Sequence, residues 1–152
     1  MRANLAGLPF APLDAVVSLQ VVEHLWDLPG FLREVRRIAG WACLSTPNRL
    51  TFSPGLPRGA KPTNPFHVEE FDAEQLVDLL SAAGFTRIEM FGVHHGARLS
   101  QRPAIIAEQI DASLSGHWPA ELEEFVSSVT VNDFTVTGYD VDTSLDLVVV
   151  AS

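Results

Sequence analysis

The chain has 152 residues, of which 47% are apolar and 19% are charged. This length and composition suit one globular domain with a real core and argue against a disordered chain. The formal net charge of −9 argues against a nucleic-acid-binding protein, because phosphate contacts require clustered lysine and arginine.

The first predicted elements are a strand, a helix and a second strand. Residues 13–19 (LDAVVSL) form a continuous apolar run, which is typical of a strand covered on both faces in a parallel sheet. Asp27 can cap the following helix, and Gly40 is expected to stop it before a short strand at 41–45. The apolar side chains that share one face of this helix are Leu28, Phe31, Leu32, Val35 and Ile38.

A proline-rich stretch follows at residues 46–70, and its five prolines exclude regular structure throughout. Loops of this length in compact domains are usually functional or mobile. The next helix has the clearest start signals in the chain. Asp72 and Gln75 have the spacing of a capping box, and Phe71 and Leu76 have that of a hydrophobic staple.

The remaining elements complete an alternating order. Gly84 is expected to end the helix, and residues 85–92 to form a strand. Two more helices are predicted at 104–114 and 119–128, and a final strand at 145–151. This order predicts an α/β fold with a mostly parallel sheet, helices on both faces and an antiparallel final strand.

Cys43 is the only cysteine, so the chain can form no internal disulfide, and a reducing compartment is expected. No apolar stretch approaches the roughly 20 residues of a membrane span, and residues 1–10 lack the features of a signal peptide. We therefore expect a cytoplasmic protein without nucleic-acid or membrane partners.

Several short segments, taken in their order and spacing, resemble the C-terminal part of class I S-adenosylmethionine-dependent methyltransferases. The segments are residues 4–10 (NLAGLPF), 13–25 (LDAVVSLQVVEHL), 32–38 (LREVRRI), 44–49 (LSTPNR) and the pair Gly84–Phe85. Further segments, STPNRLTFSPG, NPFH and GVHHGARL, resemble an actinobacterial subgroup that has been connected with O-methylation of polymethylated glucose polysaccharides.

The resemblance implies an incomplete Rossmann-like fold that uses S-adenosylmethionine. Residues 1–152 would form a single partial methyltransferase domain: the second half of the core at 1–92, a helical insertion at 93–128 and the final strand region at 129–152. The glycine-rich turn and the acidic ribose-binding residue of the family have no counterpart here. We therefore expect this chain alone to bind the cofactor weakly or not at all.

The resemblance also assigns candidate cofactor residues. Asn4 and Leu5 correspond to the segment that meets the adenine, although Asn4 is also an ordinary turn residue. Ser18, Leu19 and Gln20 lie at the carboxyl end of a parallel strand, where α/β sheets place their ligands. Ordinary packing at the strand end explains Leu19 equally well.

His24 is the candidate catalytic residue. It would act as a general base or orient the acceptor, although a Glu23–His24 pair also commonly braces such a turn. Asn48, Arg49 and His67 are the candidate acceptor-binding residues in the proline-rich loop. Arg49 alternatively pairs with Glu69 or Glu70 at the surface.

No metal site is expected from the sequence. His94 and His95, taken with His67, Glu69 and Glu70, suggest a metal option, but their spacing matches no standard motif.

Two functions remain open at this point. One is methyl transfer to a hydroxyl of a small molecule or saccharide. The other is a non-catalytic remnant that forms a homodimer through an open sheet edge or pairs with a chain that supplies the missing half. A different nucleotide-binding enzyme is disfavoured because no G-x-G-x-x-G or P-loop pattern is present.

Overall fold

A computed structural model describes residues 12–152, so the candidate cofactor residues Asn4 and Leu5 lie outside the described residues. The chain divides into two compact units. The first unit runs to residue 93 and resumes at residue 137, and the second spans residues 94–136. The division into a core half, an insertion and a final strand region remains a prediction.

The first unit is built around a sheet whose strand order is β1-β2-β5-β3-β4. β1 pairs with β2 in parallel, whereas β5 is antiparallel to both β2 and β3. The expected α/β class and antiparallel final strand are therefore confirmed. The elements are β1 (Leu13–Leu19), α1 (Leu28–Ile38), β2 (Ala39–Pro47), α2 (Arg49–Phe52), α3 (Ala73–Ala82), β3 (Ile88–His95) and β5 (Asp146–Ala151), with short 3-10 turns η1 (Val22–His24) and η3 (Val141–Thr143).

Helix α1 begins as its sequence predicts and ends differently. The Asp27 side chain accepts a hydrogen bond of 2.8 Å from the Gly30 N–H, and all five predicted core residues of the helix are buried. Gly40 does not stop the helix. Ala39 is already extended and pairs with Leu13. Helix α1 therefore ends where β2 begins to pair with β1, and not at a glycine cap.

Helix α3 confirms both predicted start signals. Asp72 and Gln75 form a reciprocal capping box, and Phe71 and Leu76 are buried in the same apolar cluster. Gly84 follows the helix with a φ of +97°, a backbone conformation that favours glycine. The next strand begins at Ile88 rather than at residue 85 as expected, because Phe85 turns inward and is buried in the core.

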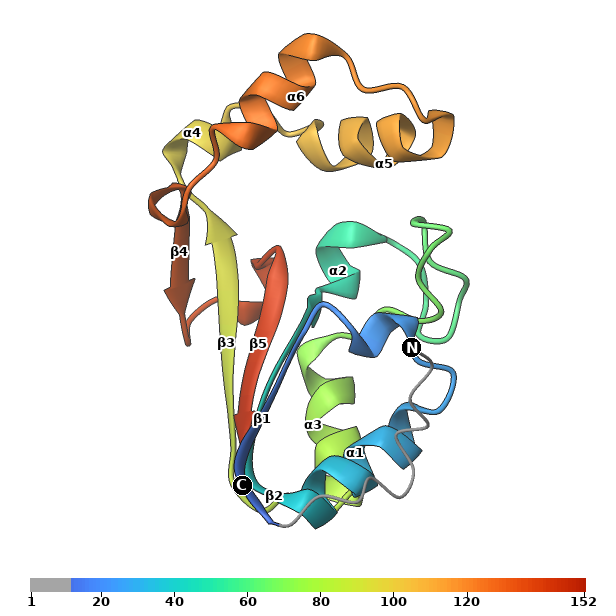
Figure 1. Cartoon of the computed structure of the whole chain (residues 1–152), viewed down its shortest axis with the longest axis vertical. Helices are drawn as coiled ribbons and strands as arrows, with labels where there is room; N and C mark the ends of the chain where they lie inside the picture. The colour runs from blue at the N-terminus through green and yellow to red at the C-terminus, as the bar shows by residue number, and fades with distance from the viewer. Residues whose placement is uncertain (1–11) are drawn as a thin grey trace. The chain divides into compact units, whose positions relative to one another are not determined.

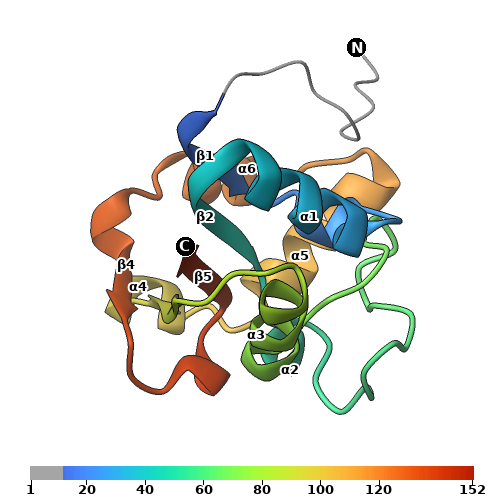
Figure 2. The ribbon, with the colours of Figure 1, turned by 90° about the horizontal axis from the view of Figure 1, so that it is seen from below.

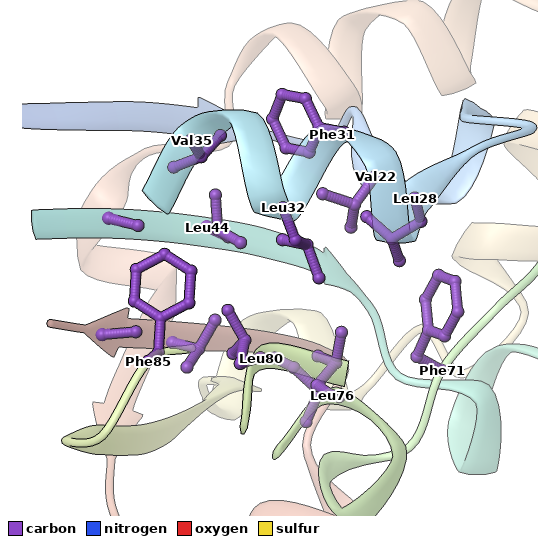
Figure 3. Packing of buried hydrophobic residues seen from close by; sticks show 14 residues of the cluster. Val22, Leu28, Phe31, Leu32, Val35, Leu44, Phe71, Leu76, Leu80 and Phe85 are labelled. Atoms are coloured by element: carbon purple, nitrogen blue, oxygen red, sulfur yellow. The ribbon is translucent and has the colours of Figure 1, made fainter. Parts of the chain in front are cut away.

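The core of the first unit lies between the sheet and the adjacent helices α1 and α3 (Figures 1 and 2). Leu32 of α1, Leu80 of α3 and Leu147 of β5 are almost completely removed from solvent. Figure 3 shows Leu32 of α1 and Leu76 and Leu80 of α3 gathered with Leu44 of β2 in the buried cluster. This packing fixes both helices on one face of the sheet.

On the face of the sheet away from α1 and α3, large apolar side chains of β1 and β2 are exposed. Val17 is 65% exposed and Leu19 is 57% exposed, while Trp41, which pairs with Ala15 in the register, is 49% exposed. The expectation that β1 is covered on both faces is therefore wrong for the described residues. β1 pairs on one edge with β2 and meets the helices on one face, so only Val16 and Ser18 are partly buried.

The proline-rich stretch contains more structure than expected. Thr46 and Pro47 continue β2, and Asn48 caps the short helix α2 by accepting a hydrogen bond from the Leu50 N–H. The chain from residue 53 to residue 70 contains no helix, and its proline content accounts for this.

The second unit is helical. It contains α4 (Ala97–Ser100), α5 (Ile105–Ser115), α6 (Ala120–Ser127), the 3-10 turn η2 (Val131–Asp133) and most of β4 (Phe134–Thr137). The two longer helices were predicted, whereas α4 and β4 were not. Ile105, Ala112 and Leu122 form its small core. No helix within residues 12–152 is long and apolar enough to cross a membrane.

Candidate functional site

The candidate site begins where the parallel strands β1 and β2 end. Their carboxyl ends meet at the same edge of the sheet, where α/β folds bind ligands. Gln20 follows β1 with a φ of +53°, which is uncommon for a residue other than glycine. Its N–H donates to the Ser45 carbonyl at 3.0 Å, so β2 holds this unusual backbone position in place.

The Gln20 side chain connects the carboxyl ends of β1 and β2 to the start of β5. Its amide donates to Ser45 Oγ and to Asp146 Oδ1, both at 3.3 Å. Burial raises the pKa of the Asp146 carboxyl to about 6, and the nearby Glu23 carboxylate raises it further against the lowering effect of the Gln20 hydrogen bond. Asp146 was not recognised as a candidate from sequence, because it stands at the start of a strand predicted only from its apolar residues.

Glu23 lies in the η1 turn, and its side chain is 1% exposed. Thr46 Oγ1 donates to Glu23 Oε2 at 3.1 Å, and Glu23 Oε1 lies 3.7 Å from His24 Nε2. The other ring nitrogen of His24, Nδ1, lies 2.9 Å from the Phe66 carbonyl oxygen. Since a carbonyl only accepts, His24 donates from Nδ1, which leaves the Nε2 lone pair facing Glu23 when the ring is neutral.

His67 comes from the proline-rich loop and is similarly held. Its Nδ1 lies 2.6 Å from Glu70 Oε1, and the other oxygen of this buried carboxylate accepts a hydrogen bond of 2.6 Å from Ser53 Oγ. The Asn64 amide lies 3.0 Å from His67 Nε2. These contacts fix the orientation of a ring that is largely buried.

The backbone brings the two histidines together. The N–H groups of Val68 and Glu69 donate to the Glu23 carbonyl at 2.8 and 3.3 Å, which places the loop against the η1 turn. The rings of His24 and His67 meet edge to face with centroids 5.1 Å apart. One ligand atom from each of Glu23, His24 and His67 lies within 4.8 Å of the others, a grouping that sequence analysis did not propose.

The other candidate cofactor residues lie along β1. Ser18 is partly buried on the helix side, whereas Leu19 is on the uncovered face with Val17. Neither residue contacts the histidine pair through any hydrogen bond described for residues 12–152. Their role beside a cofactor remains a prediction.

Asn48 and Arg49 are held by contacts within the protein. The buried Asn48 amide donates to the carbonyls of Val141, Asp142 and Ser144 at 3.0–3.1 Å. Arg49 pairs with Asp72, and not with Glu69 or Glu70 as the alternative interpretation expected. A role of these two residues in acceptor binding remains a prediction. In this structure their side chains bind other residues of the chain.

Asp72 connects the loop to the start of α3. Burial alone would raise the pKa of its carboxyl, but hydrogen bonds from Arg58, the Gln75 N–H and Arg49 lower it to about 2. Arg49 and Arg58 therefore anchor the loop at a permanently ionised helix cap.

No family model matches the sequence, but curated proteins of two mycobacteria are similar to it. The chain is 45% identical to a protein of Mycobacterium tuberculosis (strain CDC 1551 / Oshkosh) named probable S-adenosylmethionine-dependent methyltransferase, over 99% of this chain and 60% of the relative. A similarly named protein of Mycolicibacterium smegmatis is 42% identical over 99% of this chain and 63% of its own length. The chain thus spans about three fifths of these curated relatives.

Solved structures share the fold at low sequence identity. A S-adenosylmethionine-dependent methyltransferase from Thermotoga maritima superposes with a TM-score of 0.63 at 16% identity, over 100% of this chain and 62% of that one. A second one, from Archaeoglobus fulgidus, gives a TM-score of 0.54 at 17% identity, over 97% and 62% of the two chains. The fold is therefore the Rossmann-like fold of these methyltransferases.

We predict that replacing Asp146 with asparagine stabilises the protein at neutral pH. Because the pKa of Asp146 is raised in the folded state, folding favours its protonated form, and the unfolding free energy falls as pH rises from about 4 to about 6. Asp146→Asn should remove this loss, which is on the order of 2 kcal/mol at pH 7, and should have little effect at pH 4.

Urea unfolding at pH 4 and pH 7 measures the difference. Asp78→Asn, a change of an exposed carboxylate on α3, is the matched control and should shift stability equally at both pH values. An Asp146→Asn protein that is less stable than the parent at pH 7 would contradict the prediction.

Proposed function

We propose that this chain forms part of an S-adenosylmethionine-dependent methyltransferase that methylates a hydroxyl of a small molecule or saccharide. The relatives named for this activity support the class, and the fold agrees with it. The observation that carries the proposal is the position of His24. It follows the strand end that α/β folds use for ligands, and it stands beside a second histidine and a buried carboxylate.

The cofactor would lie along the carboxyl end of β1, at Ser18, Leu19 and Gln20, with Asn4 and Leu5 at its adenine. The backbone of Gln20 supports this proposal, because non-glycine residues held at positive φ cluster at ligand sites. Ser45 and Asp146 fix the Gln20 side chain, so the turn after β1 is already organised before any ligand arrives.

When bound, S-adenosylmethionine would supply an electrophilic methyl group on its sulfonium sulfur. Transfer of this methyl group to the acceptor oxygen would release S-adenosylhomocysteine. The protein has to position the acceptor in line with that methyl group and accept the hydroxyl proton. Because His24 Nδ1 donates to the Phe66 carbonyl, Nε2 faces Glu23, where it can accept the proton of the acceptor or hold its hydroxyl. The loop that carries His67 would complete the acceptor site.

We predict that His24→Gln abolishes most methyl transfer and leaves cofactor affinity nearly unchanged. The test uses a protein in which this chain is joined to the part of the Mycobacterium tuberculosis relative that it does not match. Transfer of labelled methyl from S-adenosylmethionine to glucose oligosaccharides and small hydroxyl acceptors is measured. The loss should be about 100-fold or more, the usual contribution of a positioned acid–base group.

His117→Gln is the matched control, because His117 is an exposed histidine of the second unit. It should retain parental activity. Full activity in His24→Gln, with the same product, would remove His24 from the reaction. The absence of methyl transfer to every acceptor would contradict the proposed activity itself.

A second function has its own observation, the apolar residues on the uncovered face of β1 and β2. Exposed contiguous apolar surface on a soluble chain usually marks an interaction site, and an unpaired edge strand is a template for pairing. Val17, Leu19 and Trp41 supply such a surface here. The alternative is therefore a non-catalytic chain that associates with itself or with a partner through β1.

We predict that this chain by itself self-associates and that Val17→Lys shifts it toward the monomer. A buried lysine would leave an unpaired charge in the interface. Light scattering across a concentration series measures the mass. Val131→Lys, at a valine that is 83% exposed in the second unit, is the control and should associate like the parent. A monodisperse parent monomer would contradict the alternative.

A further inference from the structure

We propose that Glu23, His24 and His67 bind a divalent transition-metal ion. One donor atom from each side chain lies within 4.8 Å of the other two. Donors about 2.0–2.2 Å from a common ion are separated by roughly 3–4.5 Å, so modest side-chain rotation brings the three into a coordination sphere. The three residues come from the η1 turn and the proline-rich loop, which backbone hydrogen bonds already join.

His24 has the orientation of a metal ligand. A ligating histidine almost always donates its second ring N–H to a carbonyl or a carboxylate, which fixes the ring. The Phe66 carbonyl serves this purpose for Nδ1 of His24. The remaining nitrogen, Nε2, lies 3.7 Å from Glu23 Oε1, a separation too long for a hydrogen bond and suited to an ion between the two atoms.

His67 shows the stronger form of the same arrangement. Glu70 accepts from Nδ1 at 2.6 Å, and Ser53 in turn donates to Glu70, so a carboxylate and a hydroxyl support the imidazole from behind. On the opposite side of the ring, the amide of Asn64 lies 3.0 Å from Nε2. An incoming ion takes the place of this single neutral donor.

The electrostatics of the site favour a cation. Glu23 is a fully buried carboxylate, and a buried charge needs a partner of opposite sign. Thr46 stabilises one of its oxygens without compensating the charge. Glu70 adds a second carboxyl, behind His67. A divalent ion compensates this concentration of negative charge.

The ligand set limits the identity of the ion. Two imidazoles and one carboxylate suit Zn²⁺, Mn²⁺, Fe²⁺ or Co²⁺ better than Mg²⁺ or Ca²⁺, which prefer oxygen ligands. Three protein ligands leave at least one position for another oxygen. If the proposed methyl transfer is correct, this oxygen is the acceptor hydroxyl, and the ion makes its proton easier to lose to solvent water, because Nε2 of His24 is then occupied by the ion and does not take the proton. His24 then orients the acceptor through the ion.

The test measures Zn²⁺ binding to the full chain by calorimetry, and Co²⁺ binding by visible absorption, without any cofactor. We expect one Zn²⁺ per chain and visible Co²⁺ bands that excess Zn²⁺ removes. His24→Gln and His67→Gln should each weaken Zn²⁺ binding by about 100-fold, and Glu70→Gln by about 10-fold or more through its effect on His67. Circular dichroism confirms that each variant is folded.

His117→Gln is the control for adventitious binding at an exposed histidine. Absence of Zn²⁺ binding, or binding that survives in both site variants, would overturn the proposal. Loss of binding in His117→Gln alone would do the same. The outcome is separable from the proposed function: metal binding without methyl transfer contradicts only the enzyme activity, whereas methyl transfer that persists in excess chelator, without Zn²⁺ binding, contradicts only the metal site.

Discussion

The candidate site depends on the hydrogen bond from the Val68 N–H to the Glu23 carbonyl oxygen. This contact joins the η1 turn at the end of β1 to Val68 of the proline-rich loop, 45 positions later in the sequence. Without it, Glu23 and His24 would stand on a turn beside solvent, and His67 would belong to an unrelated loop. Phe66 and Glu69 reinforce the same junction from either side of Val68.

Each side of this junction is held by the core. Val22 of η1 and Phe71, just after the loop, are buried in the same cluster as the faces of α1 and α3. The Arg49–Asp72 pair ties the start of the loop to its end. A loop that lacks regular structure is therefore fixed at both ends, which lets it carry two oriented side chains, His67 and Glu70.

The sequence predicted the elements well where a local rule controls them. Asp27 and Asp72 cap their helices as expected, because a capping bond needs only residues within one turn. Sequence-based prediction failed for features that the pairing and packing of the sheet determine. Gly40 is an ordinary strand residue because β2 starts pairing at Ala39, and the exposure of Val17 depends on which elements cover β1.

The site was predicted residue by residue rather than as a group. His24 and His67 were each selected from the sequence, but their contact results from the fold of a proline-rich loop, which no periodicity describes. Thr46 and Asp146 carried no signal, since their importance lies in which residues they contact, and Glu70 was named only as a partner for Arg49 or as part of a different metal grouping. Conversely, Asn48 has the residue type of a binding group, yet its amide is consumed by three backbone carbonyls.

The exposed apolar face and the candidate site share one strand, β1. The strand that exposes Val17 and Leu19 on its face ends in the turn that positions Gln20 and His24. The relatives extend beyond the matched region by about two fifths of their length.

Calorimetric titration with S-adenosylhomocysteine tests whether the carboxyl end of β1 binds the cofactor. It compares this chain alone with the protein in which it is joined to the unmatched part of the Mycobacterium tuberculosis relative. We expect binding with a Kd on the order of micromolar in the joined protein, about −8 kcal/mol, and at least about tenfold weaker binding in this chain alone. A joined protein that folds and shows no binding would contradict the proposed methyltransferase function.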